Sequence, residues 1–302
     1  MDEMNVEKNV DNTTENVEAK NIQIITAKSA GFCFGVKRAI DRAYEVIEKS
    51  QTNIYTYGPI IHNETVTSDL EKKGVRIIHD ENELEALKDA TIVIRSHGIG
   101  KKIYDICEAN HLEIIDATCP FVSKIHDIVQ KHSLEGVTVI IVGDPKHPEV
   151  EGIKGWSDGY VIQDIDDFIN LNLDKSRLFC VVAQTTFNHT KFKKIVDKMQ
   201  DMGYDILCFN TICNATKERQ KEALDIASRV DAMIVIGGKN SSNTNKLYEI
   251  CSNVCARTFM IQTVADLDIE WFQGASKIGI TAGASTPDII VREVQNYVRT
   301  KF

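Results

Sequence analysis

The amino-acid sequence predicts an α/β fold of three related units, arranged about a pseudo-threefold axis around a central site. Three segments share one layout, an apolar strand followed by a polar loop and a helix: 53–74, 137–155 and 232–251. The same layout recurs in a second set: 91–107, 178–196 and 277–294. Strands that alternate with helices favour parallel sheets of the βαβ type. Such sheets carry functional loops at the carboxyl ends of their strands, so we expect all six loops to face one cavity.

One cysteine opens each unit. The first polar loop follows 28 or 29 residues after each of Cys33, Cys119 and Cys213. This spacing predicts three α/β domains, at 22–118, 119–211 and 212–302. The segment 1–21 is rich in acidic residues and lacks apolar periodicity, which predicts a disordered tail.

Composition excludes several classes of protein. The chain has 302 residues, 43% of them hydrophobic and 26% charged, which is typical of a globular protein. No apolar run is long enough for a membrane span, and a net charge of −9 argues against a nucleic-acid partner. The N-terminus lacks the pattern of a secretory signal, so we expect a cytoplasmic protein whose eight cysteines are reduced.

The three matched cysteines each follow a strand and precede a helix. A thiol at a helix N-terminus meets the positive end of the helix dipole, which lowers its pKa and favours the metal-binding thiolate. The other cysteines fit core packing instead: Cys107, Cys180, Cys208, Cys251 and Cys255. Cys251 and Cys255 could also share one helix face as metal ligands, but packing explains them equally well.

Three thiolates from three units, without any CxxC pair, do not resemble a zinc finger. They suit a [4Fe–4S] cluster in which one iron stays open for a substrate. A zinc ion with three thiolates and a water is an alternative that the sequence leaves open.

The polar loops would form a cage rich in hydrogen-bond donors and nearly free of charge. Its members are His62, His97, His147, Thr185, Ser241, Ser242, Asn243 and Ser285. Such a cage suits a phosphate or diphosphate. Glu149 is its one evident carboxylate and the candidate proton donor, which Thr185 would orient, whereas Glu151 is interpreted as structural. No glycine-rich dinucleotide or nucleotide motif is present.

Taken in order, these motifs resemble the IspH/LytB family of 4-hydroxy-3-methylbut-2-enyl diphosphate reductases. The matching stretches are GFCFGV (31–36), IIHNETV (60–66), SHG (96–98), DATCPFV (116–122), HPEVEG (147–152), QTT (184–186), IC (212–213), KNSSNTN (239–245) and TAGASTPD (281–288). The resemblance covers residues 22–300, and the segment around Cys213 is the loosest match.

The resemblance implies a trefoil-like fold around an oxygen-sensitive cluster held by Cys33, Cys119 and Cys213. It implies the last step of the non-mevalonate (MEP) isoprenoid pathway, in which an allylic diphosphate loses its hydroxyl and becomes isopentenyl and dimethylallyl diphosphate. Glu149 and Thr185 would handle the proton, the other cage residues would bind the diphosphate, and a ferredoxin- or flavodoxin-type protein would supply electrons. Two alternatives are a zinc-dependent hydrolase that uses Glu149 as its base, and a non-enzymatic sensor of a diphosphate or of oxygen.

Overall fold

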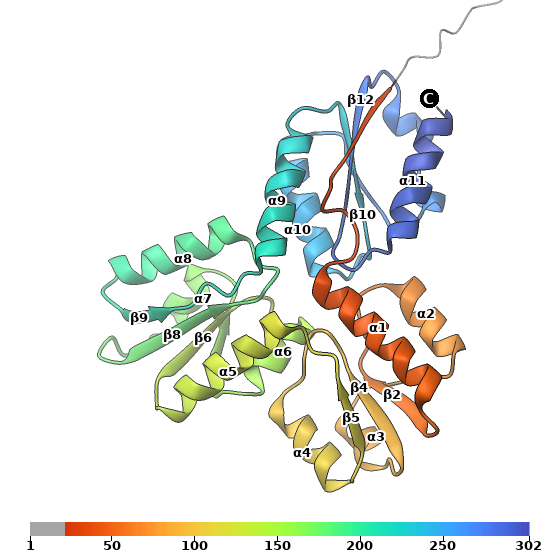
Figure 1. Cartoon of the computed structure of the whole chain (residues 1–302). Helices are drawn as coiled ribbons and strands as arrows, with labels where there is room; N and C mark the ends of the chain where they lie inside the picture. The colour runs from red at the N-terminus through yellow and green to blue at the C-terminus, as the bar shows by residue number, and fades with distance from the viewer. Residues whose placement is uncertain (1–21, 302) are drawn as a thin grey trace, which may run out of the picture.

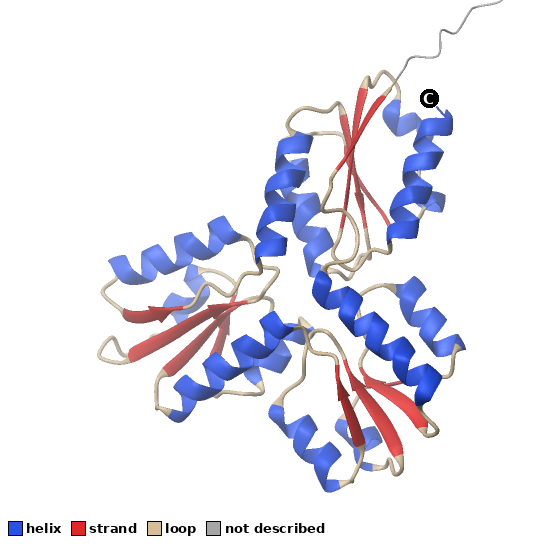
Figure 2. Ribbon diagram, viewed as in Figure 1, coloured by secondary structure: helices blue, strands red, loops and turns tan. Residues whose placement is uncertain are grey.

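The computed structural model describes residues 22–301, so the predicted tail, 1–21, lies outside the described residues. Three lobes meet at the centre of the molecule, and each lobe holds one four-stranded parallel sheet between helices (Figures 1 and 2). This arrangement confirms the predicted fold class. Within residues 22–301, no helix is both long and apolar enough to cross a membrane.

The first sheet has the strand order β3-β2-β4-β5. Its strands are β2 (Asn53–Tyr57), β3 (Arg76–Ile78), β4 (Ala90–Ile94) and β5 (Glu113–Asp116). Its helices are α1 (Phe34–Lys49), α2 (Glu64–Lys72), α3 (Glu81–Glu85) and α4 (Lys101–Ala109). The central strand β4 is buried along its whole length, because α1 and α2 cover one face of the sheet while α3 and α4 cover the other.

The second sheet repeats this order as β7-β6-β8-β9. Its strands are β6 (Thr138–Val142), β7 (Tyr160–Ile162), β8 (Leu178–Ala183) and β9 (Asp205–Cys208). Its helices are α5 (Pro120–Leu134), α6 (Pro148–Lys154), α7 (Ile165–Asn170) and α8 (His189–Asp201). Helices α5 and α6 pack on one face, and α7 and α8 pack on the other, so the layering of the first unit is repeated.

The third sheet has the order β11-β10-β12-β1 and takes its last strand from the other end of the chain. Its elements are β1 (Gln23–Thr26), β10 (Ala232–Ile236), β11 (Thr258–Ile261), β12 (Lys277–Ala282), α9 (Asn214–Ala227), α10 (Ser242–Ser252), α11 (Asp288–Lys301) and the 3-10 turns η1 (Val264–Asp266) and η2 (Ile269–Phe272).

Strand β1 therefore lies in the sheet of the third unit, although the sequence placed it in the predicted domain 22–118. It pairs with β12 in parallel, from Gln23 beside Lys277 to Thr26 beside Ile280. The reason is the repeat itself. Strands β5 and β9 end one sheet and lead into the cysteine of the next unit, and β1 does the same for Cys33, so the three units form a closed ring. The remaining boundaries, at 118/119 and 211/212, stay predictions.

The first and second units touch through glycine backbone. Gly155 ends α6, and a Cβ added there would lie 2.5 Å from the Cα of Gly100. Beside this contact, the Trp156 indole N–H donates to the Ile99 carbonyl at 2.8 Å. Side chains on these glycines would separate the loop after β4 from α6, so this contact sets the distance between the two units.

We expect Gly155→Ala to destabilise the protein by about 1–3 kcal/mol, because the new methyl group meets rigid backbone rather than a movable side chain. Chemical denaturation followed by circular dichroism measures the change. Asn253→Ala is the matched control, since Asn253 also ends a helix with negative φ but is exposed. Equal stability of the two variants would contradict the proposed role of the contact.

Candidate functional site

The structure brings every predicted site residue to the wall of one central cavity. The lining includes the predicted thiols, imidazoles, hydroxyls, amide and carboxyl: Cys33, Cys119, Cys213, His62, His97, His147, Ser241, Ser242, Asn243, Ser285, Thr185 and Glu149. All three units contribute to this wall. The cavity therefore lies where the three lobes meet.

Each matched cysteine is the N-cap residue of a long helix, α1, α5 or α9. Its backbone N–H donates to a carbonyl in the polar loop that follows β12, β4 or β8 of the adjoining sheet. These hydrogen bonds are Cys33 to Ala284 (3.1 Å), Cys119 to Ser96 (3.0 Å) and Cys213 to Thr185 (3.0 Å). The same bond at three related positions fixes each thiol to a loop that also carries a polar side chain of the cavity.

Burial changes the expected chemistry of the thiols. The first-turn amides of α5 do lower the pKa of Cys119, as the helix-dipole argument predicts, but burial outweighs them and raises that pKa to about 11. Burial also raises the pKa of Cys213, although the first-turn amides of α9 lower it. The predicted lowering by the helix ends was therefore wrong for these two thiols. A bound metal ion would favour the thiolates, because it binds the deprotonated form.

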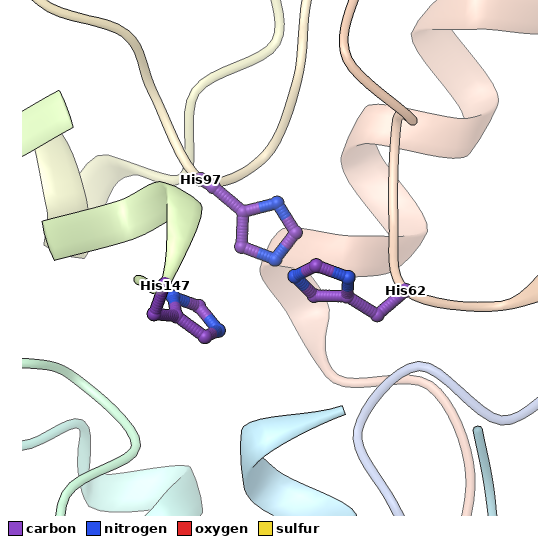
Figure 3. A group of neighbouring side chains, drawn as sticks. All are labelled: His62, His97 and His147. Atoms are coloured by element: carbon purple, nitrogen blue, oxygen red, sulfur yellow. The ribbon is translucent and has the colours of Figure 1, made fainter. Parts of the chain in front are cut away.

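Three histidines from three loops face one another across the cavity. His62 follows β2, His97 follows β4 and His147 caps α6 (Figure 3). One ring nitrogen from each lies within 4.8 Å of those of the other two. Burial lowers all three pKa values, that of His62 to about 4 and that of His147 to about 3. The rings are therefore neutral near pH 7.

The neutral imidazoles keep donors available for a ligand. His147 Nδ1 accepts a hydrogen bond from the Glu149 N–H at 3.1 Å, so the proton of this ring is on Nε2. His62 Nε2 and His97 Nδ1 are buried and have no hydrogen-bond partner among the described residues. Buried polar atoms are normally paired, so these nitrogens indicate a place for a polar ligand.

The N-terminus of α10 adds hydroxyl and amide groups. Ser241 caps this helix, and its Oγ accepts from the Thr244 N–H at 3.3 Å. Ser285 Oγ lies 3.4 Å from Ser241 Oγ and donates to the His62 carbonyl at 3.2 Å. Both polar atoms of the buried Asn243 side chain lack a partner among the described residues. Free donors at a helix N-terminus favour an anion.

Glu149 is almost fully buried, at 3% exposure, and is held by one residue. Its Oε1 accepts from the Thr185 N–H at 2.6 Å, and its Oε2 accepts from Thr185 Oγ at 2.7 Å. These bonds favour the carboxylate, but burial is stronger and raises the pKa of Glu149 to about 7. Glu149 therefore exchanges a proton near neutral pH, as a general acid requires.

Two buried arginines near the cavity were not among the predicted site residues. Arg219 lines the cavity, and its guanidinium donates to the carbonyls of Ala282 (2.7 Å) and Gly31 (3.0 Å). Arg95 is buried next to the loop that carries His97. Two signals could have revealed them: Arg219 shares a helical face with Ala223 and Ile226, and Arg95 interrupts the apolar run before SHG.

Cys251 and Cys255, the possible metal pair, are buried in one core cluster of the third unit. Their thiols donate to the carbonyls of Ala223 and Val230, at 3.8 and 3.9 Å. These contacts fit the interpretation as packing residues.

Comparison with known proteins agrees with the geometry. The model of the family described as LytB protein matches residues 24–299. A 4-hydroxy-3-methylbut-2-enyl diphosphate reductase of Caldanaerobacter subterraneus subsp. tengcongensis is 44% identical over 282 residues, covering 92% of this chain and 97% of that protein. The enzyme of the same name from Thermoanaerobacter sp. strain X514 is 47% identical over 283 residues, with the same coverage of both chains.

Two solved structures share the fold. A structure of (E)-4-hydroxy-3-methyl-but-2-enyl diphosphate reductase is 40% identical with a TM-score of 0.67, and the match covers 92% of this chain and 99% of that one. The structure of E-1-hydroxy-2-methyl-but-2-enyl-4-diphosphate reductase from Plasmodium falciparum is 31% identical with a TM-score of 0.84, and the match covers 93% of this chain and 88% of that one. The resemblance found in the sequence is thus confirmed, and the chain belongs to the LytB family.

Proposed function

We propose that this protein is a 4-hydroxy-3-methylbut-2-enyl diphosphate reductase. Two electrons and two protons remove the allylic hydroxyl as water and leave isopentenyl and dimethylallyl diphosphate, the last step of the non-mevalonate pathway. The observation that carries the proposal is the shared cavity. Three thiols, a carboxyl with a pKa of about 7 and a neutral cage of donors all face it.

We infer that Cys33, Cys119 and Cys213 hold a [4Fe–4S] cluster. The donor set fits, because the three thiols line one cavity and Gly35 leaves room for Cys119 Sγ, which would lie 2.5 Å from a Cβ at position 35. Bound there, the cluster supplies electrons and a Lewis-acidic iron. A single zinc ion held by the three thiolates and a water is the alternative, and analysis of metal and sulfide distinguishes the two.

The cage residues bind the diphosphate in this proposal. The unpaired nitrogens of His62 and His97, the Nε2–H of His147 and the free amide of Asn243 are donors that phosphate oxygens accept. The hydroxyls of Ser241, Ser242 and Ser285 add further donors beside the N-terminus of α10. These groups are already in place, so little ordering is required when the anion binds.

Glu149 gives the proton that turns the departing hydroxyl into water. Its burial keeps the acid form populated near pH 7, and the two hydrogen bonds from Thr185 fix the orientation of the carboxyl. Thr185 Oγ can pass a proton between Glu149 and the substrate because a hydroxyl both donates and accepts.

The reaction consumes two electrons, and we propose that a ferredoxin- or flavodoxin-type protein delivers them. All eight cysteines are free thiols, which agrees with a reducing compartment such as the cytoplasm. The direct test is anaerobic purification, analysis of iron and sulfide, and a dithionite-driven assay with the allylic diphosphate. Zinc without sulfide would favour the hydrolase, and ligand binding without turnover would favour the sensor.

We expect Cys213→Ser to lose the cluster or to hold it weakly, because one of three thiolate ligands is replaced by a poor one. Iron and sulfide per chain, together with visible absorbance after anaerobic purification, measure this loss. Cys251→Ala is the control and should leave the iron content unchanged, since its thiol contacts a backbone carbonyl in the core. Normal iron in Cys213→Ser would refute the assignment of the third ligand.

We expect Glu149→Gln to keep the cluster and substrate affinity but to lose at least about 100-fold in kcat, the usual scale of a general acid. In the unchanged enzyme, kcat should fall as pH rises above about 7, because the raised pKa of Glu149 marks the loss of its acid form. Steady-state kinetics from pH 6 to 9 test both points. A flat profile, or normal turnover by Glu149→Gln, would show that another group delivers the proton.

A further inference from the structure

Arg95 holds a buried positive charge next to the loop that carries His97. It follows β4 and precedes Ser96 and His97, and only 7% of it is exposed. Its Nε donates to the Gly98 carbonyl at 3.4 Å, so the side chain folds back beneath its own loop. On the other side, Gly58 leaves the space that the guanidinium occupies. Backbone on both sides therefore fixes the position of this charge.

The charge of Arg95 lacks a close counter-ion. Among residues 22–301, no carboxylate lies within 4.0 Å of its guanidinium. Glu151 is its main favourable charged neighbour, with a smaller contribution from Tyr57, yet burial still lowers the pKa of Arg95. Burying an unpaired charge is costly, so its retention here calls for a compensating anion.

The positive charge of Arg95 acts electrostatically on all three cage histidines. It contributes to the lowered pKa values of His62, His97 and His147. Three neutral imidazoles with nitrogens within 4.8 Å of one another are also a good set of ligands for a divalent cation such as Zn²⁺. Imidazole geometry alone does not choose between a cation and an anion, but a fixed positive charge behind the rings repels the first and attracts the second.

We propose that Arg95 is the specificity-determining residue of the cage: its fixed charge makes three neutral imidazoles a site for the diphosphate anion and disfavours a divalent cation. Arg95 acts through the field that it places on the cage and through its bond to the His97 loop, so it is a positioning residue. The inference deepens the proposed function and rests on the diphosphate site named there.

The first test measures the binding of inorganic diphosphate to the anaerobic, cluster-loaded protein by isothermal titration calorimetry. Arg95→Met keeps much of the side-chain length but removes the charge, and it should weaken binding by about tenfold or more. Arg95→Lys should recover most of the affinity. Arg76→Met is the matched control, because Arg76 is exposed on β3, and it should bind as the unchanged protein does. With the allylic diphosphate, Arg95→Met should raise KM more than it lowers kcat.

The second test uses Zn²⁺ on the same cluster-loaded proteins and separates charge from structural damage. Removing the charge should strengthen Zn²⁺ binding at the cage severalfold while it weakens diphosphate binding. A merely structural defect would weaken both, and that result would overturn the proposal. Unchanged diphosphate affinity in Arg95→Met would overturn it as well.

The two proposals can fail separately. Normal turnover with no effect of Arg95 on diphosphate affinity would remove this inference and leave the enzyme activity intact. Diphosphate binding that depends on Arg95, in a protein without turnover, would support this inference and refute the reductase.

Discussion

One hydrogen bond, made three times, connects the two halves of the site. The backbone N–H of each N-cap cysteine donates to a carbonyl in the loop after β4, β8 or β12. Those loops carry His97, Thr185 and Ser285, which line the cavity. The backbone that carries each thiol is therefore hydrogen-bonded to a loop that also lines the cavity. The threefold repeat thereby links the positions of the proposed metal ligands to those of the proposed substrate ligands.

The ring of units is closed at the first cysteine by contacts between distant parts of the chain. Strand β1 pairs with β12, and Arg219 of α9 donates to Gly31, two residues before Cys33. At the next junction, Arg38 of α1 donates to the carbonyl of Thr118, one residue before Cys119, at 2.9 Å. In both cases an arginine on one cysteine-capped helix steadies the loop that leads to another cysteine. The contacts that close the ring of units therefore also position the segments that carry the thiols.

The sequence predicted much of this arrangement because spacing is a local property. Near-constant offsets from Cys33, Cys119 and Cys213 to the polar loops predicted three units, and the alternation of strands with helices predicted parallel sheets whose loops share a cavity. The partner of β1 could not be read in the same way, since it lies more than 250 residues away. The pKa of Cys119 was misjudged because the helix end is visible in sequence but the depth of burial is not. Arg95 and Arg219 were missed because an arginine in a sequence usually indicates a solvent-exposed position.

Burial gives the cavity its chemical character. It keeps the histidines neutral, holds Glu149 as an acid near pH 7 and raises the pKa of two thiols, so the predicted site residues bring little charge of their own. Anionic groups that enter such a place need positive charge nearby, since a low dielectric makes an unpaired charge costly. Arg219 interacts electrostatically with Cys33 and Cys213, and Arg95 does so with the histidine cage. Two arginines fixed by backbone carbonyls therefore offset negative charge at the thiols and at the cage, while the groups that face the ligand stay neutral and free to donate hydrogen bonds.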